Sequence, residues 1–342
     1  MAVKPTEPVR RAAIVGCGDV FGVHADAIDA IDGIDLVAVC DTDPERLEIA
    51  AKARGVAAYR SHCEVLAEAR PHVVHIATPH DQHVPLTIDC LEAGVHVLQE
   101  KPIAHTIEEG QRLVDAACNA RAKVGICFQN RYNVASQEAR RIVDSGVLGA
   151  IQGAYASVVW SRTVDYYATR PWRGTVARSG GGLLINQAIH TLDLVQWLMG
   201  DVIAVGGDVA TRKFADTIEV EDTAEALFTH ASGAQTCFYA TLTAPADRPV
   251  EIEIHGDRGA LTIRDGLTLT LDDGTVEVIP ERHVASTGRA YWGVSHELLI
   301  RDFYATLEEP EPFWISPRDA MASLRMLTAL YQRTRETGKE RT

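Results

Sequence analysis

The sequence lacks any run of about 18 apolar residues, the length that a membrane-spanning helix needs. Its first ten residues are polar and include two prolines, so they lack the apolar stretch of a secretory signal. Basic residues are outnumbered, with 33 Lys and Arg against 47 Asp and Glu, and the formal net charge is -14. An acidic chain repels nucleic acid and anionic membranes. We therefore expect a cytoplasmic protein with a short frayed N-terminal tail and no nucleic-acid or membrane partner.

Two further absences exclude classes of chemistry. The seven cysteines are scattered and form no Cys-x-x-Cys motif, which favours buried thiols in a reducing compartment. No Gly-x-Ser-x-Gly motif occurs, so the signature of a serine hydrolase is missing. Four histidines crowd one stretch, but no cysteine has matching spacing, and they span a strand end and a helix start: His72, His75, His80 and His83. We predict no metal site.

The first 130 residues alternate short apolar strands with helical patterns. At about 100–200 residues per domain, 342 residues suggest two domains. Alternating strands and helices predict a parallel sheet covered by helices on both faces. The predicted strands are Arg11–Gly16, Asp35–Asp41, His72–Ala77, Val95–Gln99 and Val124–Phe128, with a weaker one at Ala57–Tyr59. We place an NAD(P)-binding Rossmann domain, a doubly wound α/β fold, at residues 1–130.

The pattern changes in the second part of the chain. Strands with alternating apolar and polar residues predict a large, mostly antiparallel open sheet within an α+β domain at residues 131–342. These strands are Ile151–Trp160, Thr223–Thr229, Thr236–Thr243, Val250–His255, Ala260–Ile263 and Leu267–Leu271. We expect the last helix, Pro317–Thr337, to pack back on the Rossmann domain. The apolar open face of the sheet predicts a homodimer or homotetramer.

A dinucleotide fingerprint follows the first strand. Gly16 permits a tight turn, and Gly18 lets the backbone approach a pyrophosphate at the start of a helix, beside Asp19 and Val20. Phe21 replaces the usual third glycine, so a simple glycine-rich turn is an alternative. Asp41 ends the second strand, where a carboxylate accepts hydrogen bonds from the adenosine ribose and repels a 2′-phosphate. The cofactor is therefore predicted to be NAD, with NADP less favoured; a turn or N-cap role for Asp41 is the alternative.

Three more motifs follow in order. Ala77-Thr78-Pro79, with His83 four residues later, ends the third strand, and Glu100-Lys101-Pro102 ends the fourth. Ligands bind at this carboxyl edge in doubly wound sheets. Gly180-Gly181-Gly182 then precedes a helical pattern on which Asn186, His190 and Asp193 stand at i, i+4 and i+7, hence on one face. A lone histidine in such a helix is more often structural, but this polar stripe favours a functional one.

Together these motifs resemble the Gfo/Idh/MocA oxidoreductases over nearly the whole chain. The resemblance implies that Lys101 lies by the nicotinamide and the reacting carbon, and that the Lys101–Pro102 bond is cis. It also implies that Glu100 lines the cofactor pocket with His83, and that Thr78 and Pro79 lie along the dinucleotide. The segment Gln129-Asn130 is expected to contact substrate and nicotinamide, and Trp172-Arg173 to approach the nicotinamide, with a packed surface loop as the alternative. His296 is a weaker candidate for a substrate contact.

The resemblance implies hydride transfer between NAD and a secondary alcohol or ketone of a sugar, glycoside, nucleotide sugar or polyol, with a sugar C3 hydroxyl as the leading substrate position. We expect His190 to be the general base and Lys101 to donate a hydrogen bond to the reacting oxygen. Asp193 could orient His190 or form a buried salt bridge. Asn186 stands where inositol dehydrogenase-like members carry aspartate, which makes inositol less favoured and leaves Lys101 as an alternative base.

Two other functions stay open on the sequence. Some relatives are NAD-dependent glycosidases that keep the cofactor bound through turnover. The family also includes a regulator without enzymatic activity, which would make the chain a sugar or NAD sensor. Such regulators tend to lose the lysine or the histidine, and both Lys101 and His190 are present here.

Overall fold

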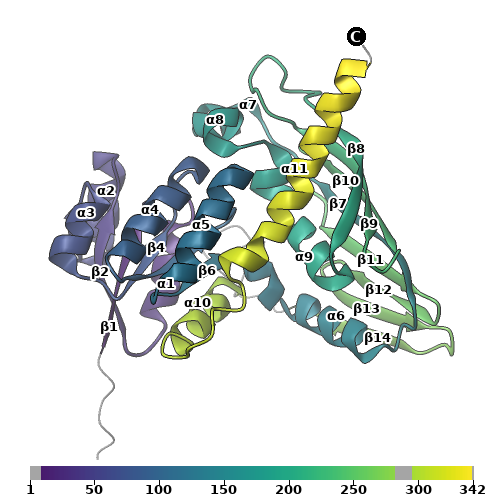
Figure 1. The fold of residues 1–342 in the computed structure, drawn as a ribbon, viewed down its shortest axis with the longest axis horizontal. Helices are drawn as coiled ribbons and strands as arrows, with labels where there is room; N and C mark the ends of the chain where they lie inside the picture. Colours follow the sequence, from purple (N-terminus) through teal and green to yellow (C-terminus); the bar gives the residue numbers. More distant parts are fainter. Residues whose placement is uncertain (1–8, 282–294, 341–342) are drawn as a thin grey trace, which may run out of the picture. The chain divides into compact units, whose positions relative to one another are not determined.

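The computed structural model describes residues 9–281 and 295–340, so most of the predicted N-terminal tail lies outside the described residues. The chain forms two compact units (Figure 1). Among the described residues, the first comprises 9–103, 109–129 and 295–319, and the second comprises 104–108, 130–281 and 320–340. This division differs from a single boundary at residue 130. Residues 295–319 group with the first unit, and most of the last helix groups with the second rather than with the Rossmann unit.

The first unit is built on a six-stranded parallel sheet with the strand order β3-β2-β1-β4-β5-β6, which confirms the predicted Rossmann fold. Its strands are β1 (Arg10–Val15), β2 (Ile34–Cys40), β3 (Ala57–Tyr59), β4 (Val73–Ile76), β5 (His96–Glu100) and β6 (Val124–Cys127). Its helices are α1 (Phe21–Asp29), α2 (Pro44–Arg54), α3 (His62–Glu64), the π-helix η1 (Val65–Ala69), α4 (His80–Glu92), α5 (Ile107–Asn119) and α10 (Ser295–Ala305).

A close approach explains why α10 belongs to this unit. A Cβ at Gly125 in β6 would lie 2.8 Å from a ring carbon of Phe303 and 2.9 Å from one of Phe313. The missing side chain lets both rings pack on the strand, and the Ile126 amide donates to the Ile315 carbonyl at 2.9 Å. Glycine inside a strand is typical of such a close contact, which the strand pattern alone did not reveal.

The second unit is built on an eight-stranded sheet with the order β14-β13-β12-β11-β7-β10-β9-β8 (Figure 1). Only β7 and β10 pair in parallel, so the mostly antiparallel prediction is confirmed. The strands are β7 (Ile151–Val159), β8 (Val202–Ala210), β9 (Thr223–His230), β10 (Gln235–Thr241), β11 (Glu251–Gly256), β12 (Gly259–Ile263), β13 (Gly266–Leu271) and β14 (Val276–Pro280).

Both edge strands of this sheet, β8 and β14, were not predicted. β8 contains Gly206 and Gly207 and is only partly buried, and β14 is almost wholly exposed. Neither strand has a buried residue, so neither shows the alternation of buried apolar and exposed polar residues that identifies a strand.

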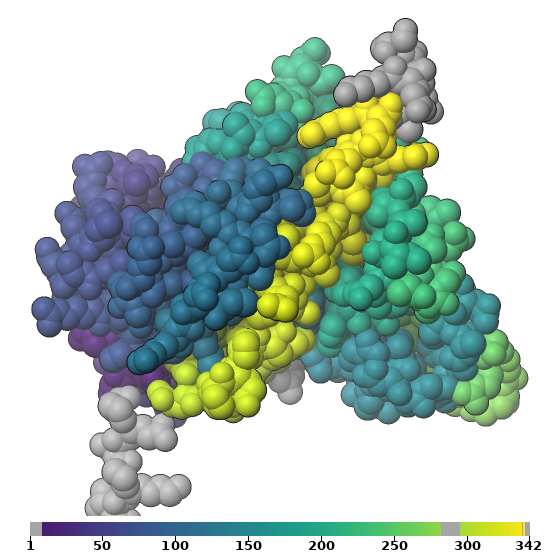
Figure 2. All heavy atoms as spheres, in the orientation of Figure 1, coloured from purple at the N-terminus to yellow at the C-terminus, as the bar shows by residue number. Residues whose placement is uncertain are grey.

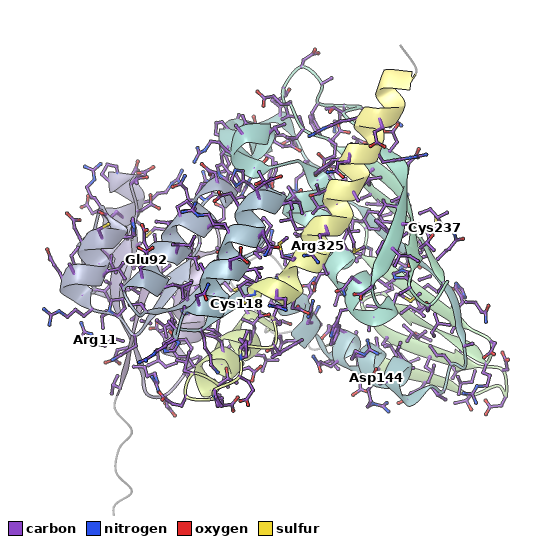
Figure 3. The ribbon with its side chains drawn as sticks, viewed as in Figure 1. Arg11, Glu92, Cys118, Asp144, Cys237 and Arg325 are labelled. Atoms are coloured by element: carbon purple, nitrogen blue, oxygen red, sulfur yellow. The ribbon has the colours of Figure 1, made fainter. Side chains whose placement is uncertain are left out.

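The helical segments of the second unit include the pieces that carry the candidate site. They are η2 (Gln129–Tyr132), which begins in the first unit, α6 (Val134–Ser145), α7 (Val164–Ala168), η3 (Pro171–Gly174), α8 (Val176–Ser179), the π-helix η4 (Leu184–Ala188), α9 (Ile189–Met199) and α11 (Pro317–Glu340). On α11, Leu324, Leu327 and Leu330 form a buried stripe. Arg325 is exposed (Figure 3), and the outer side of α11 forms part of the surface drawn in yellow in Figure 2. In the described ranges, every helix is too short or too polar to cross a bilayer.

Candidate active site

The turn between β1 and α1 requires glycine at its first position. Gly16 has φ +104°, and a Cβ there would lie 2.4 Å from the Ala77 carbonyl oxygen. A Cβ on Gly18 would meet nothing within 4 Å, so the backbone is open there. Asp19 is exposed, Val20 is half-buried, and α1 follows at once. The turn therefore combines an accessible backbone with a helix N-terminus, the combination that suits a pyrophosphate.

Phe21 and Asp41 explain how the turn is held without its third glycine. Phe21 packs against a buried cluster that includes Cys17 and Leu47, so the large side chain is absorbed by β2 and α2. Asp41 follows β2, and its Oδ2 accepts the Cys17 amide at 2.7 Å while its Oδ1 accepts the Asp43 amide at 2.8 Å. Asp43 is the N-cap of α2. A carboxylate offers about four acceptor positions, so Asp41 keeps capacity for a ribose.

Buried His83 joins the motifs at the ends of β4 and β5, and buried Gln99 holds the second of them. His83 contacts the Pro102 carbonyl through Nδ1 at 2.8 Å and the Thr78 carbonyl through Nε2 at 3.0 Å. The Gln99 amide donates to the Pro102 and Ile103 carbonyls at 3.1 and 2.9 Å. The Lys101–Pro102 peptide bond is cis, as the resemblance implied.

The ring of His83, an expected cofactor contact, has no exposed surface in this structure. Burial lowers its pKa, so the neutral ring donates to one of the two carbonyls. Thr78 and Pro79 lie beside it at the start of α4 and stay half-buried. The Thr78 hydroxyl oxygen is itself buried and has no hydrogen-bond partner among the described residues.

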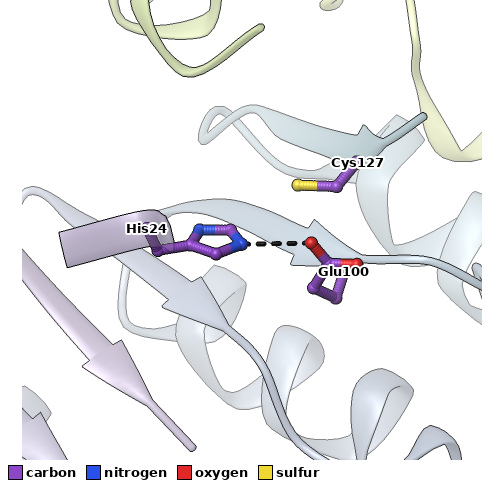
Figure 4. Close-up of side chains that lie close together, drawn as sticks. All are labelled: His24, Glu100 and Cys127. Carbon is purple, nitrogen blue, oxygen red and sulfur yellow. Dashed lines mark hydrogen bonds and ion pairs between the residues drawn. The ribbon is translucent and has the colours of Figure 1, made fainter. Parts of the chain in front are cut away.

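Glu100, which was expected to line the cofactor pocket, is 7% exposed. Its side chain turns into the interior of the first unit, where Oε1 accepts from His24 Nε2 at 3.1 Å and lies 3.4 Å from His296 Nε2. Cys127 lies beside this pair (Figure 4). His296 is 2% exposed, so the structure gives it a buried role rather than a substrate contact.

His24, Glu100 and Cys127 are also the one group in the described part of the chain whose ligand atoms come close enough to hold a metal ion. The four histidines of the crowded stretch do not form such a group there. Burial and Glu100 raise the pKa of the Cys127 thiol well above its usual range, so this sulfur keeps its proton. A protonated thiol is a poor metal ligand, because metal binding requires the thiolate.

At the start of the second unit, the expected contact Asn130 lies in η2 and is half-buried, and the preceding Gln129 is buried. Gln129 Oε1 has no hydrogen-bond partner among the described residues. Arg131, which follows Asn130, forms a bidentate ion pair with Asp193, and both nitrogen–oxygen distances are 2.7 Å. Ser323 donates to the same carboxylate at 3.1 Å. The structure therefore places Asp193 in the buried salt bridge, and it anchors α9 rather than facing substrate.

The segment that carries Asn186 and His190 is not one regular helix. Residues 184–188 form a π-helix, and α9 begins at Ile189. The extra residue in a π-turn shifts the faces, so the i, i+4, i+7 stripe does not survive intact. Asn186 and His190 are half-buried, whereas Asp193 is 1% exposed. π-turns are frequent at functional sites.

A buried carboxylate holds the glycines before this segment. Glu221 accepts the Gly182 amide at 2.8 Å, the Leu184 amide at 2.9 Å and the Tyr331 hydroxyl at 2.8 Å. A Cβ on Gly182 would lie 2.1 Å from the Glu221 carbonyl oxygen, which explains the glycine. Burial raises the pKa of Glu221, and the three donors oppose that rise.

Trp172 and Arg173 lie in η3, where the Arg173 guanidinium stacks on the Tyr166 ring at 4.5 Å. The Tyr166 hydroxyl in turn accepts the Gln187 amide at 2.6 Å. This chain of contacts joins the Trp-Arg element to the π-helix, next to Asn186. The Trp-Arg element is therefore packed against the segment that carries Asn186.

The sequence did not indicate the buried residues whose hydrogen bonds hold the candidate site residues in place: His24, Gln99, Arg131, Glu221 and Tyr331. Each lies inside a helix, a strand or a turn where it reads as an ordinary polar residue. Two weak signals were present. His24 is a polar residue on the buried side of α1, and Glu221 and Asp222 form an acidic pair just before a strand.

Comparisons with known proteins agree with this geometry. Residues 10–128 match an oxidoreductase family described as an NAD-binding Rossmann fold, and residues 136–262 match the GFO/IDH/MocA C-terminal domain. D-apiose dehydrogenase of Paraburkholderia graminis is 28% identical over 95% of this chain and 88% of its own. D-glucoside 3-dehydrogenase of Escherichia coli is 25% identical over 96% of both.

A solved structure gives the same result. The WlbA dehydrogenase of Bordetella pertussis, determined with NADH and UDP-GlcNAcA, is 30% identical, with a TM-score of 0.84 over 97% of this chain and 98% of that one. The chain belongs to the GFO/IDH/MocA family of NAD-binding oxidoreductases.

Proposed function

We propose that this protein transfers a hydride between NAD and a secondary alcohol or ketone of a sugar, glycoside, nucleotide sugar or polyol, with a sugar C3 hydroxyl as the leading position. The observation that carries the proposal is the Glu100-Lys101-Pro102 turn, held at the carboxyl end of β5 by buried partners. The names of the relatives support a carbohydrate: D-apiose, D-glucoside and a nucleotide sugar acid. In this proposal, the first unit binds the dinucleotide and the second supplies substrate contacts.

The residues present suit the cofactor. The open backbone at Gly18, the spare acceptors of Asp41 and the orphaned Thr78 hydroxyl offer groups for the pyrophosphate, a ribose and a polar contact. Pro79 would lie along the dinucleotide, and Asn130, Trp172 and Arg173 would approach the nicotinamide. NAD⁺, when bound, accepts the hydride.

The protein's own residues would handle the proton and the charge. His190 accepts the hydroxyl proton as general base, and Lys101 donates a hydrogen bond to the same oxygen and stabilises its developing charge. The amide of Asn186 is not basic enough to take up a proton. It orients a substrate hydroxyl through hydrogen bonds, as do Gln129 and Asn130. Lys101 is the alternative base.

The decisive assay follows NAD⁺ reduction across free sugars, glycosides, inositols and nucleotide sugars. Turnover with one class, with NADH released at each cycle, would support the dehydrogenase and name its substrate. Cleavage of a glycoside without NADH release would replace it with the cofactor-retaining glycosidase. Tight NADH binding with no turnover on the whole panel would replace it with the sensor.

Cofactor choice gives a separate prediction. We expect Asp41→Ser to lower the preference for NAD⁺ over NADP⁺ by about tenfold or more, equivalent to about 1.4 kcal/mol. The carboxylate repels a 2′-phosphate, and serine does not. The measurement is kcat/KM for both cofactors, and Asp43→Ser, which changes the neighbouring N-cap, is the control. An unchanged ratio in Asp41→Ser would remove Asp41 from the ribose site.

We also propose a homodimer or homotetramer formed through the open face of the β7–β14 sheet. Tyr155, Cys237 and Leu227 are exposed, and the strand register places them side by side across β7, β10 and β9. Figure 3 shows Cys237 on β10. An exposed apolar row of this kind marks an interface.

Light scattering tests the assembly. We expect a dimer or tetramer mass for the wild type and a monomer mass for Leu227→Arg, because a buried guanidinium without a partner opposes association. Ile49→Arg places the same charge on an exposed isoleucine of α2 and should leave the mass unchanged. A monomeric wild type would contradict the proposal.

A further inference from the structure

Glu100 is the centre of a buried polar network in the first unit, supplied by four elements besides its own strand. His24 comes from α1, His75 from β4, Cys127 from β6, and His296 with Tyr304 from α10. His24 and His296 face Oε1, and Oε2 accepts the Lys101 amide at 3.2 Å. The Cys127 sulfur lies within 4.8 Å of a ligand oxygen of this carboxylate. His83 and Lys101 are the other ionisable groups near it. Figure 4 shows the His24–Glu100 pair with Cys127 beside it.

Glu100 is therefore an ionised carboxylate with donors on both oxygens. Burial would raise its pKa, yet the imidazole N–H donors of His24 and His296 hold that pKa well below the usual range. A buried charge is stable only when hydrogen bonds satisfy it. The network supplies these bonds to a carboxylate that also accepts the Lys101 amide.

The protons of the network can be counted. The Nδ1 atoms of His24 and His75 lie 2.8 Å apart, so one N–H bridges them. Burial lowers the pKa of His75 well below its ordinary value, so His75 is neutral and has a single N–H. The His24 hydrogen that faces Glu100 must be on Nε2, because the carboxylate can only accept. With this as the one N–H of His24, the bridging N–H belongs to His75. His75 then donates from Nδ1 and accepts at Nε2 from the Tyr304 hydroxyl, 3.0 Å away. One arrangement thus satisfies every ring nitrogen of this pair.

We propose that His24 and His296 are positioning residues that act as N–H donors, holding the Glu100 carboxylate ionised and fixed against the backbone of Lys101. This inference rests on the proposed function, because it assigns Lys101 to the reacting oxygen. The donor of His24 that faces Glu100 is Nε2, so an amide nitrogen at that place should replace it. Packing alone would instead be served by any ring of similar size.

The kinetic test compares His24→Phe, which keeps an aromatic ring without an N–H donor, with His24→Gln, which keeps an N–H donor without a ring. We expect His24→Phe and Glu100→Gln to lower kcat at least about tenfold, since small displacements of a reacting group are costly. The KM for substrate and the dissociation constant of NADH should stay within about threefold. His24→Gln should keep most of the wild-type kcat, because its amide donates from nearly the Nε2 position. Glu92→Gln, an exposed carboxylate on α4, is the control and should match the wild type.

Two outcomes would overturn the inference. Equal losses of kcat in His24→Gln and His24→Phe would mean that the imidazole, and not a donor, is required. A fall in NADH affinity that parallels the loss of kcat would mean that the network only supports the fold. Thermal unfolding of each variant, with the assay run well below the transition, keeps these results interpretable.

A second measurement needs no activity and no variant. Nitrogen NMR of the ¹⁵N-histidine-labelled wild type should show, at neutral pH, one ring protonated only on Nδ1, His75, and His24 protonated only on Nε2. Both nitrogens of His24 protonated would overturn the neutral donor. So would one equivalent of zinc that survives dialysis against a chelator. If no sugar reduces NAD⁺ with the wild-type protein, the proposed function fails. The NMR measurement of the His24 and His75 tautomers still tests whether His24 donates to Glu100.

Discussion

An Asp193→Asn variant is expected to lose about 3–5 kcal/mol of unfolding free energy, because it leaves the Arg131 guanidinium buried without its counter-charge. Both side chains of the pair are 1% exposed. Arg131 also stacks on the Trp197 ring at 5.6 Å, so it cannot move to solvent without breaking that contact. Chemical denaturation of the purified variant measures the loss.

The same substitution on the surface provides the control. Asp144 pairs with Arg140 at i, i+4 on α6, and its side chain is 61% exposed (Figure 3). Asp144→Asn should cost only about 0–1 kcal/mol, because water screens the pair. The double variant Arg131→Met with Asp193→Leu should regain much of the loss, since it removes both buried charges. Equal losses in the two single variants would contradict the structural role of Asp193.

A His190→Asn variant is expected to lose about 10²–10⁴-fold in kcat for alcohol oxidation, the usual contribution of a general base. The dissociation constant of NADH should hardly change, because His190 is assigned to the substrate. A base must be unprotonated, so wild-type kcat should rise with pH through one ionisation. That rise should vanish in His190→Asn and persist in Lys101→Met, whose kcat falls about 10²–10³-fold through lost charge stabilisation.

Matched substitutions away from the site complete this test. His255→Asn on β11 and Lys52→Met on α2 change exposed residues of the same types and should keep wild-type rates. If the rise with pH vanishes in Lys101→Met and persists in His190→Asn, the two roles exchange and Lys101 is the base. The exchange of roles is worth testing because Asn186 stands where inositol dehydrogenase-like members carry an aspartate that works with the histidine.

The local motifs were predictable because each depends on a few neighbouring residues. Gly16 needs φ +104°, Asp43 and Pro44 start α2, and the apolar run of β5 ends in Glu100-Lys101-Pro102. Short apolar strands that alternate with helices also indicate a parallel sheet, because a parallel crossover usually contains a helix. The functional family followed from four such motifs in order.

The π-turn shows where periodicity stopped being informative. A count of i, i+4 and i+7 assumes 3.6 residues per turn throughout. Glu221 binds the Gly182 and Leu184 amides, and the segment that follows takes a wider turn. That carboxylate lies 37 residues from Leu184, so no pattern near His190 could indicate it.

The sequence by itself determined the Rossmann fold, the glycine turn, the expectation of NAD and, through the resemblance, the cis bond after Lys101. Only the tertiary structure decided which polar residues face inward. Glu100 and His24 are 76 residues apart, and Asp193 and Arg131 are 62 apart. Their pairing depends on strand order and helix packing, and a buried charge keeps its ionised form only where those elements bring it a partner.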